Sequence, residues 1–221
     1  MRPLLIAIDG PSGAGKGTVS RTVSQALGYH HVDTGAMYRA VAWKAVQDGL
    51  SLTDEAAVGA LAANASLVCG DGRIEIDGHD VARAIRTPEI DRAAAAVARL
   101  PAVRDVLVAR QRKLGEKGGV VMEGRDIGTV VFPRADVKVY LDALPEERAR
   151  RRAADAAHTG GQAGQAAVAA LIDARDKSDT TRAVSPLTLA DDAVLIDTTS
   201  LSIAEVVERV LDLVQARLAS R

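Results

Sequence analysis

A glycine-rich segment near the N-terminus has the residue types of a phosphate-binding loop. It reads Gly10-Pro11-Ser12-Gly13-Ala14-Gly15-Lys16-Gly17-Thr18. An apolar stretch precedes it and a helical pattern from Val19 to Leu27 follows, which is the context that such a loop needs. Closely spaced glycines allow successive backbone N–H groups and the helix N-terminus to face one phosphate. Lys16 adds a full charge that a simple strand-to-helix turn would not require, so the segment predicts binding of a nucleoside triphosphate.

The residues after the lysine narrow the class of phosphate-binding protein. Strict phosphate loops place Ser or Thr directly after the lysine, and that hydroxyl binds Mg²⁺ in GTPases and motor ATPases. Here Gly17 separates Lys16 from Thr18, which counts against both classes. The sequence has a single asparagine, Asn64, and therefore lacks the Asn-Lys-x-Asp motif that reads guanine in GTPases. The loop resembles instead that of nucleoside monophosphate kinases.

Three further segments combine hydroxyls, carboxylates and arginines. They are His31–Arg39, Glu123–Val131 and Arg175–Arg182. Together with the loop they resemble the bacterial cytidylate (CMP) kinases along nearly the whole chain, and the run from Gly124 to Thr129 is the most specific part. The resemblance implies a P-loop NTPase fold, ATP as co-substrate with Mg²⁺ carried on the nucleotide, and CMP or dCMP as the acceptor.

The resemblance also implies an acceptor-binding site. Its residues would be Thr34, Arg39, Arg104, Arg125, Asp126, Asp179 and Arg182. Arg39 and Arg125 would hold the monophosphate, because the planar guanidinium fork matches phosphate oxygens. Arg104 and Asp126 would lie near the base, and the last two residues of the set would lie at the sugar.

For catalysis, the resemblance implies charged residues around the transferring phosphoryl group. The set is Lys16, Arg125, Asp126 and Arg175, with Arg148, Arg151 and Arg152 as further candidates. Because Glu146 and Glu147 precede them, these last three could equally form a solvated helix face with i,i+4 ion pairs. Arg125 and Asp126 could likewise be an ion pair at a strand end, and Arg39 could be a surface charge.

These side chains need a scaffold that brings distant segments together. Short apolar runs typical of buried strands recur at Leu4–Ile8, Val120–Met122, Val137–Leu141 and Val194–Ile196. Helical patterns separate them, which indicates an α/β fold with a parallel sheet core covered by helices. With Ser202 as its cap, a last helix is predicted to bury one stripe formed by Ile203, Val206, Val207, Val210, Leu211, Val214 and Leu218.

The middle of the chain has a different texture. Between Leu67 and Val81, short alternating stretches are joined by the tight turns Gly70-Asp71-Gly72 and Gly78-His79-Asp80. This pattern predicts an antiparallel meander. We place it in a small monophosphate-binding insertion, about residues 60–100, on the rim of the parallel sheet.

A second change of texture indicates a lid. Small residues at 158–164 lie between an arginine-rich helix, Glu146–Asp155, and a helix that ends near Asp173. We expect a short lid at about 148–165 that closes over both nucleotides, together with the insertion, to exclude water. The whole chain, 1–221, would then form one kinase domain.

Composition limits the partners and the location. With 28 Lys and Arg against 29 Asp and Glu among 221 residues, the net charge of −1 predicts no binding to nucleic acid or to a membrane. The lone Cys69 suits a reducing compartment and a structural buried thiol. His30 and His31 have no metal-like spacing with Cys69 or an acidic cluster, so no metal site of protein ligands is expected. We expect a cytoplasmic monomer.

The predicted reaction is transfer of the γ-phosphoryl group of ATP to CMP or dCMP. One alternative is a kinase for another nucleoside monophosphate, such as UMP or AMP, and a second is a P-loop ATPase or switch protein. Members of the resembled family often carry a serine nine residues before the arginine that matches Arg104, where this chain has Ala95. The order of preference among CMP, dCMP and UMP therefore stays open.

Overall fold

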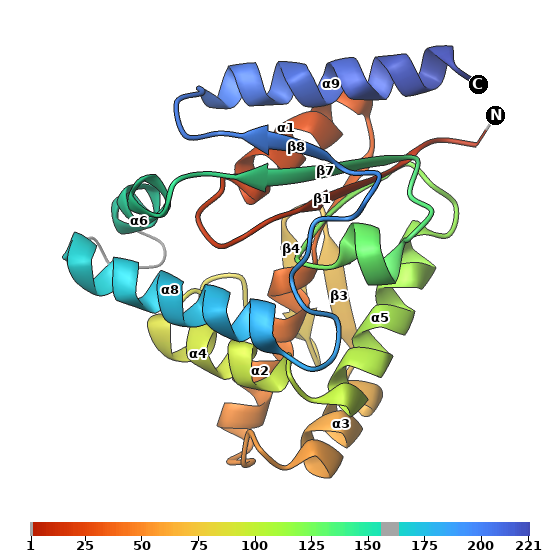
Figure 1. Cartoon of the computed structure of the whole chain (residues 1–221). Helices are drawn as coiled ribbons and strands as arrows, with labels where there is room; N and C mark the ends of the chain where they lie inside the picture. The colour runs from red at the N-terminus through yellow and green to blue at the C-terminus, as the bar shows by residue number, and fades with distance from the viewer. Residues whose placement is uncertain (1, 156–163) are drawn as a thin grey trace.

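The structure is a computed structural model that describes residues 2–155 and 164–221. Within these residues, a five-stranded sheet in the order β2-β6-β1-β7-β8 forms the core (Figure 1). Its strands are β1 (Leu5–Asp9), β2 (His30–Asp33), β6 (Val120–Glu123), β7 (Val137–Asp142) and β8 (Val194–Asp197). Every neighbouring pair is parallel. The predicted α/β fold with a parallel core is confirmed.

Helices cover both faces of this sheet. On one face, α1 (Lys16–Leu27) and α9 (Ile203–Ala219) enclose a core that includes Ile6, Ile8 and Leu141. On the other face, α5 (Pro101–Gly115) and the π-helical turn η1 (Ile127–Val131) cover Ala7, Val32 and Met122. Burial on both faces explains why the central strands read as continuous apolar runs rather than as alternating ones.

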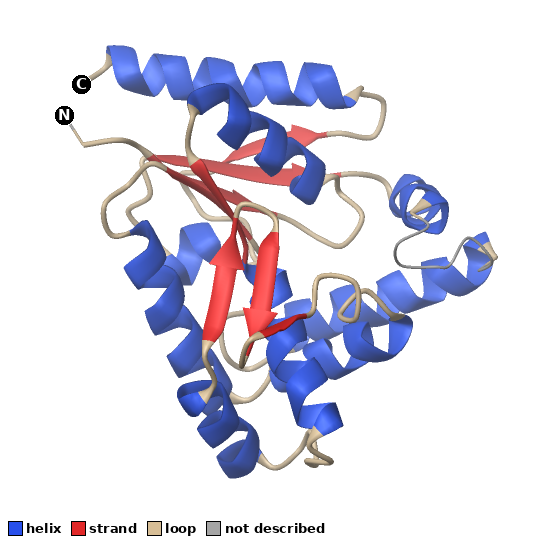
Figure 2. Ribbon diagram, turned by 180° about the vertical axis from the view of Figure 1, so that it is seen from behind, coloured by secondary structure: helices blue, strands red, loops and turns tan. Residues whose placement is uncertain are grey.

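The insertion contains a second sheet. Its strands β3 (Leu67–Gly70), β4 (Arg73–Ile76) and β5 (His79–Asp80) pair antiparallel, which confirms the predicted meander. Figure 2 shows these strands running crosswise to the main sheet. Around them lie α2 (Thr34–Gln47), α3 (Glu55–Asn64) and α4 (Pro88–Val97), with α4 against α2 and α3 against α5.

Each strand of the main sheet ends in a carboxylate. The terminal residues are Asp9, Asp33, Glu123, Asp142 and Asp197. Each of the four predicted strands stopped one residue before its carboxylate. The sequence analysis also did not predict β2. That strand lies at the edge of the sheet and begins with His30 and His31, so it lacks the apolar run of its neighbours. The carboxyl ends of all these strands meet at one edge, where open α/β sheets bind ligands.

The C-terminal helices differ in part from the prediction. The arginine-rich helix is α6 (Pro145–Ala154), and the next helix, α8 (Gln165–Thr181), runs well past Asp173. Its polar end continues as a helix because Val168, Ile172 and Asp179 share one buried face. The predicted lid of about 148–165 begins within α6 and ends at the start of α8. Its middle part, residues 156–163, lies outside the described residues.

The final helix keeps its predicted cap but not its whole stripe. Ser202 and Glu205 form a reciprocal capping box, and Val206, Val207, Val210 and Val214 are buried. Ile203 and Leu218, however, are 54% and 41% exposed. They lie in the first and last turns of α9, where the helix extends past the sheet beneath it (Figure 1).

Candidate active site

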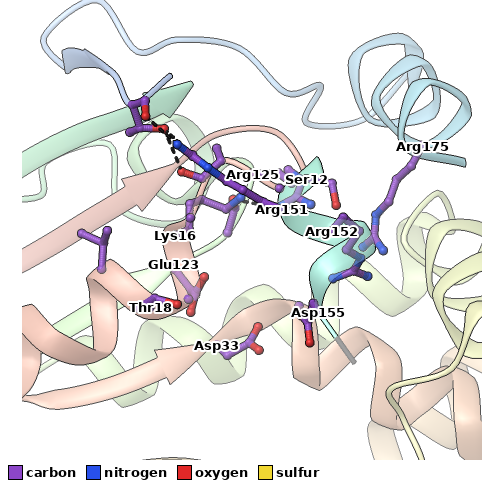
Figure 3. Close-up of a pocket in the computed structure, with 18 of the residues that line it drawn as sticks. Ser12, Lys16, Thr18, Asp33, Glu123, Arg125, Arg151, Arg152, Asp155 and Arg175 are labelled. Atoms are coloured by element: carbon purple, nitrogen blue, oxygen red, sulfur yellow. Dashed lines mark hydrogen bonds between the residues drawn. The ribbon is translucent and has the colours of Figure 1, made fainter. Parts of the chain in front are cut away.

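A large pocket opens at the carboxyl ends of the parallel strands. Its volume is about 950 Å³, and its walls come from the phosphate loop, the strand ends, the insertion, α6, α8 and the segment before α9. Figure 3 shows charged side chains from several of these elements directed into the same space. A cavity of this size accommodates more than one small ligand.

The phosphate loop forms one end of this pocket. Ser12 to Thr18 line it, whereas Gly10 and Pro11 lie beneath the lining. Gly10 passes so close to β7 that a Cβ atom there would lie 2.0 Å from the Leu141 carbonyl oxygen. Pro11 contributes its carbonyl oxygen, which accepts a hydrogen bond of 2.7 Å from Nζ of Lys16. The predicted loop is therefore formed, with its first two residues in supporting positions.

Lys16 is a buried cation at the base of the loop. Burial, together with the nearby Arg125 charge, lowers its pKa to about 7, although Glu123 and Asp9 oppose the shift. The ammonium group is therefore held where a neighbouring anion would favour its charged form. A triphosphate bound by the loop would supply that anion.

Asp9 is a site residue that the sequence analysis missed. Its two carboxylate oxygens accept hydrogen bonds from the amides of Ile127, at 2.9 Å, and Gly128, at 2.7 Å. Burial raises the pKa of Asp9 to about 6 although both hydrogen bonds oppose the shift. Asp9 thereby joins β1 to η1 and fixes the segment that begins with Arg125. The signal in the sequence was a carboxylate at the end of an apolar strand.

Another side of the pocket contains arginines that are paired with carboxylates. Nε of Arg125 donates to Asp179 at 2.9 Å, and Nη2 of Arg39 donates to Asp33 at 2.9 Å. Although burial opposes it, the charges of Arg125 and Arg175 hold the pKa of Asp179 below its ordinary value. Arg39 is buried, so the interpretation of Arg39 as a surface charge is wrong.

Asp126 is the centre of a second ion-pair group. It accepts a hydrogen bond from Arg104, and Nη2 of Arg182 lies 3.3 Å from its other oxygen. Asp126 therefore pairs with these two arginines, and the adjacent Arg125 pairs with Asp179 instead. Arg104 lies behind the pocket wall, 2% exposed and 5.7 Å above the ring of Tyr38.

Thr34 also lines this side of the pocket. Its hydroxyl donates to the backbone oxygen of Glu123 at 2.7 Å, which links the start of α2 to the end of β6. Part of the lining is apolar, since Ala94, Ala95 and Ala98, at the end of α4, contribute to it. Ala95 thus presents no hydrogen-bonding group to this cavity.

The arginines of α6 have separate partners. Arg148 pairs with Asp176 and donates to the backbone oxygens of Ala143, at 3.0 Å, and Ser12, at 3.1 Å, so it supports the phosphate loop from behind. Arg151 donates to the hydroxyl of Thr198 at 2.8 Å. Both side chains are therefore more than a solvated helix face, although the hydrogen bond from Arg151 to Glu147 is of the expected i,i+4 kind.

Arg152 and Arg175 come from different helices and share one carboxylate. Both pair with Asp91 of α4, Arg175 through Nη1 at 3.2 Å. Figure 3 shows the two guanidinium groups close together at one side of the pocket. Burial and the nearby Arg125 charge lower the pKa of Arg175. The ion pairs connect the insertion to α6 and α8 beside the pocket.

The two histidines of β2 also have separate partners. His30 is exposed and pairs with Asp71 at 2.8 Å, whereas the buried His31 lies 2.9 Å from Oε1 of Glu123. Within the described residues there is no cluster of three or more His, Cys, Asp or Glu side chains that could hold a metal ion. Across the same residues, no helix has both the length and the apolar character needed to span a membrane.

Comparison with known proteins shows which family model and which relatives this chain matches. A family model described as cytidylate kinase matches residues 6–216. The cytidylate kinase of Solibacter usitatus is 48% identical over 219 residues, which cover 98% of this chain and 94% of the relative. The cytidylate kinase of Pelotomaculum thermopropionicum is 49% identical over 216 residues, which cover 96% of each chain.

Solved structures show the likeness of the fold. A gluconokinase from Sinorhizobium meliloti superposes with a TM-score of 0.53 at 18% sequence identity, over 100% of this chain and 96% of its own. A protein named TT1252 from Thermus thermophilus has a TM-score of 0.50 at 24% identity, over 99% of each chain.

Proposed function

The chain belongs to the cytidylate kinase family, and we infer from this that it transfers the γ-phosphoryl group of ATP to CMP, giving ADP and CDP. The observation that carries this conclusion is the family match over residues 6–216, a range that includes every charged residue described in the pocket. The family match does not favour the two alternatives, a kinase for UMP or AMP and an ATPase or switch protein.

We propose that the phosphate loop holds the donor. The backbone N–H groups of Ser12 to Thr18 and the start of α1 would bind the triphosphate, and Lys16 would place its charge on the phosphate oxygens. ATP would bring Mg²⁺ as part of its complex. Glu123 and Thr18 are among the oxygen-bearing side chains that line the pocket, and oxygen ligands suit this ion.

We propose that the arginine side of the pocket holds the acceptor. Arg39 and Arg125 would bind the monophosphate of CMP, because each presents a guanidinium on the pocket wall. Asp126 would meet the base, with Arg104 behind it as a support, and Thr34 would line the same side of the pocket. Asp179 and Arg182 would lie at the sugar, and Asp179 would also orient Arg125 through their hydrogen bond.

Catalysis in this arrangement is mainly positioning and charge stabilisation. The acceptor phosphate is already an anion, so the reaction needs no dedicated general base. Negative charge spreads over the moving group in the transition state, and Lys16, Arg125 and Arg175 would stabilise it from three directions. Closure of the insertion, about residues 60–100, and of the lid would keep water out. A cytoplasmic location and a monomeric state stay predictions.

The direct test is a coupled assay of ADP release with CMP, dCMP, UMP, AMP or no acceptor. We expect ADP release to depend on an added acceptor and to be fastest with CMP or dCMP. Equal or faster turnover with AMP would reassign the acceptor site. ADP release at the same rate without any monophosphate would instead support an ATPase.

A further inference from the structure

The buried pair of His31 and Glu123 connects the edge strand to the nucleotide pocket. β2 and β6 lie side by side, and Nε2 of His31 is 2.9 Å from Oε1 of Glu123. Both residues are almost fully buried. An ionised carboxylate can only accept hydrogen bonds, so Nε2 of His31 must carry the proton in this contact.

The Glu123 carboxylate lies against the first turn of α1. Its Oε1 and Oε2 atoms are 3.5 and 3.7 Å from the point that a Cβ atom of Gly17 would occupy. The side chain lines the pocket, in the same region as Lys16 and Thr18 (Figure 3). A Cβ atom at position 17 would therefore only touch this carboxylate at van der Waals distance, which places the carboxylate directly beside the loop. In the described part of the chain, Oε2 accepts no hydrogen bond.

His31 is itself held in place, although β2 is an edge strand. Its backbone N–H donates to Oδ1 of Asp71 at 3.0 Å, and its carbonyl oxygen accepts from the Asp71 amide at 2.9 Å. The β3–β4 turn thus covers the open edge of β2 at this residue. The backbone of His31 is therefore bound on one side by β6 and on the other side by the insertion. This fixes the position from which its ring projects.

We propose that His31 is a positioning residue for phosphoryl transfer, which fixes Oε1 of Glu123 so that Oε2 stays available to the Mg²⁺ carried by the nucleotide that the loop binds. The proposal rests on the proposed function. The last torsion of a glutamate side chain is broad, so a carboxylate with one oxygen held by a rigid donor loses most of that freedom. Groups that orient a functional carboxylate in this way affect activity without touching the substrate.

A purely structural hydrogen bond would look similar, because buried polar groups generally need partners. The two roles differ in what a substitution changes. A structural partner affects the unfolding temperature, whereas a positioning partner affects kcat, and it can be replaced by another donor at the same place. His31→Gln keeps a side-chain N–H donor, His31→Leu removes it at similar volume, and His30→Leu removes the neighbouring exposed imidazole as a matched control.

We expect His31→Leu to lower kcat for CMP phosphorylation roughly tenfold or more, which is the usual scale for the loss of such an orienting partner. The KM for CMP should stay within about twofold, since that interaction is not made with the acceptor. His31→Gln should recover most of the lost kcat, and His30→Leu should resemble the wild type. Titration calorimetry should show weaker binding of a non-transferable Mg²⁺–ATP analogue to His31→Leu.

A double-mutant cycle with Glu123→Gln isolates the pair. If His31 acts through Glu123, adding His31→Leu to Glu123→Gln should change kcat by less than about threefold. The proposal is overturned if His31→Leu keeps its kcat and its analogue affinity while only the unfolding temperature falls. Equal loss in His31→Gln and His31→Leu, or full additivity in the double variant, would also overturn it. A wild type that binds the analogue but does not phosphorylate CMP would refute the proposed function, and the calorimetry would still decide the role of His31.

Discussion

The two ends of the pocket are built in different ways. The phosphate loop is one continuous segment, from Ser12 to Thr18, which lines the pocket with its backbone and with a single cation, Lys16. The acceptor end is assembled from side chains that are far apart in the sequence, such as Arg39, Arg125 and Arg182, and each is paired with a carboxylate. One end is therefore shaped by local backbone geometry, and the other by tertiary ion pairs.

This difference predicts different sensitivities to mutation. A loop made of backbone groups tolerates changes except at the lysine and at glycines that need an unusual conformation or close packing. In the ion-pair end, removal of one carboxylate leaves a buried arginine without its partner, and such a loss is costly. A mutation there alters both the ligand contacts and the positions of the neighbouring charges.

The largest expected effect is at the donor end. Lys16→Ala should lower kcat by about 10²–10³, or ~2.7–4 kcal/mol, because it removes one electrostatic contact to the transition state. Steady-state kinetics with CMP and varied ATP measure this change. Turnover close to that of the wild type would contradict the assignment of the phosphate loop.

At the acceptor end, we expect a smaller effect that depends on the substrate. Arg125→Ala should weaken all monophosphates alike, because each presents the same phosphate group. Asp126→Asn and Asp179→Asn should change the ranking among acceptors by roughly tenfold to a hundredfold, since a buried polar group left unpaired costs about 1–3 kcal/mol. The measurement is kcat/KM for CMP, dCMP, UMP and AMP. If kcat/KM fell by the same factor for every acceptor, both carboxylates would be structural residues rather than acceptor contacts.

The smallest expected effect compares two glycines of the loop. Gly13 has a φ of 82°, and a Cβ atom there would lie 2.8 Å from the backbone oxygen of Arg148, so Gly13→Ala should be destabilising. The left-handed backbone alone accounts for about 1–2 kcal/mol. Gly17 is helical and has room for a methyl group, so Gly17→Ala should stabilise the protein by about 0.5–1 kcal/mol.

Urea denaturation of both variants measures these free energies of unfolding. The comparison between them removes any general effect of adding a methyl group to the loop. If both variants were equally stable, close packing of the loop against α6 would not restrict which residues the loop can contain.

The same difference explains what the sequence could predict. The loop was recognisable because its glycines, Lys16 and the flanking strand and helix lie within one short segment. The acceptor residues could be named through the resemblance, but their partners could not. Nothing local indicates that Arg125 pairs with Asp179 rather than with Asp126, because that choice depends on where α8 packs.

The other differences between the sequence-based prediction and the structure have similar causes. β2 was missed because its pairing with β6 and with the Asp71 turn replaces the apolar run that marks a buried strand. The continuation of α8 to Thr181 depends on the burial of Asp179 against Arg125, which is a tertiary contact. The parallel sheet, the meander and the Ser202 cap, by contrast, have period or capping signals within a few residues, and these predictions were confirmed.

The central claim is that the two ends of the pocket bind different ligands. Titration calorimetry of Lys16→Ala and Arg39→Ala, each with CMP alone and with a non-transferable Mg²⁺–ATP analogue alone, tests it most directly. We predict that Lys16→Ala weakens the analogue while CMP binding stays within about twofold, and that Arg39→Ala does the reverse, by roughly tenfold or more for CMP. If each variant weakened both ligands by the same factor, the division of the pocket into a donor end and an acceptor end would be wrong.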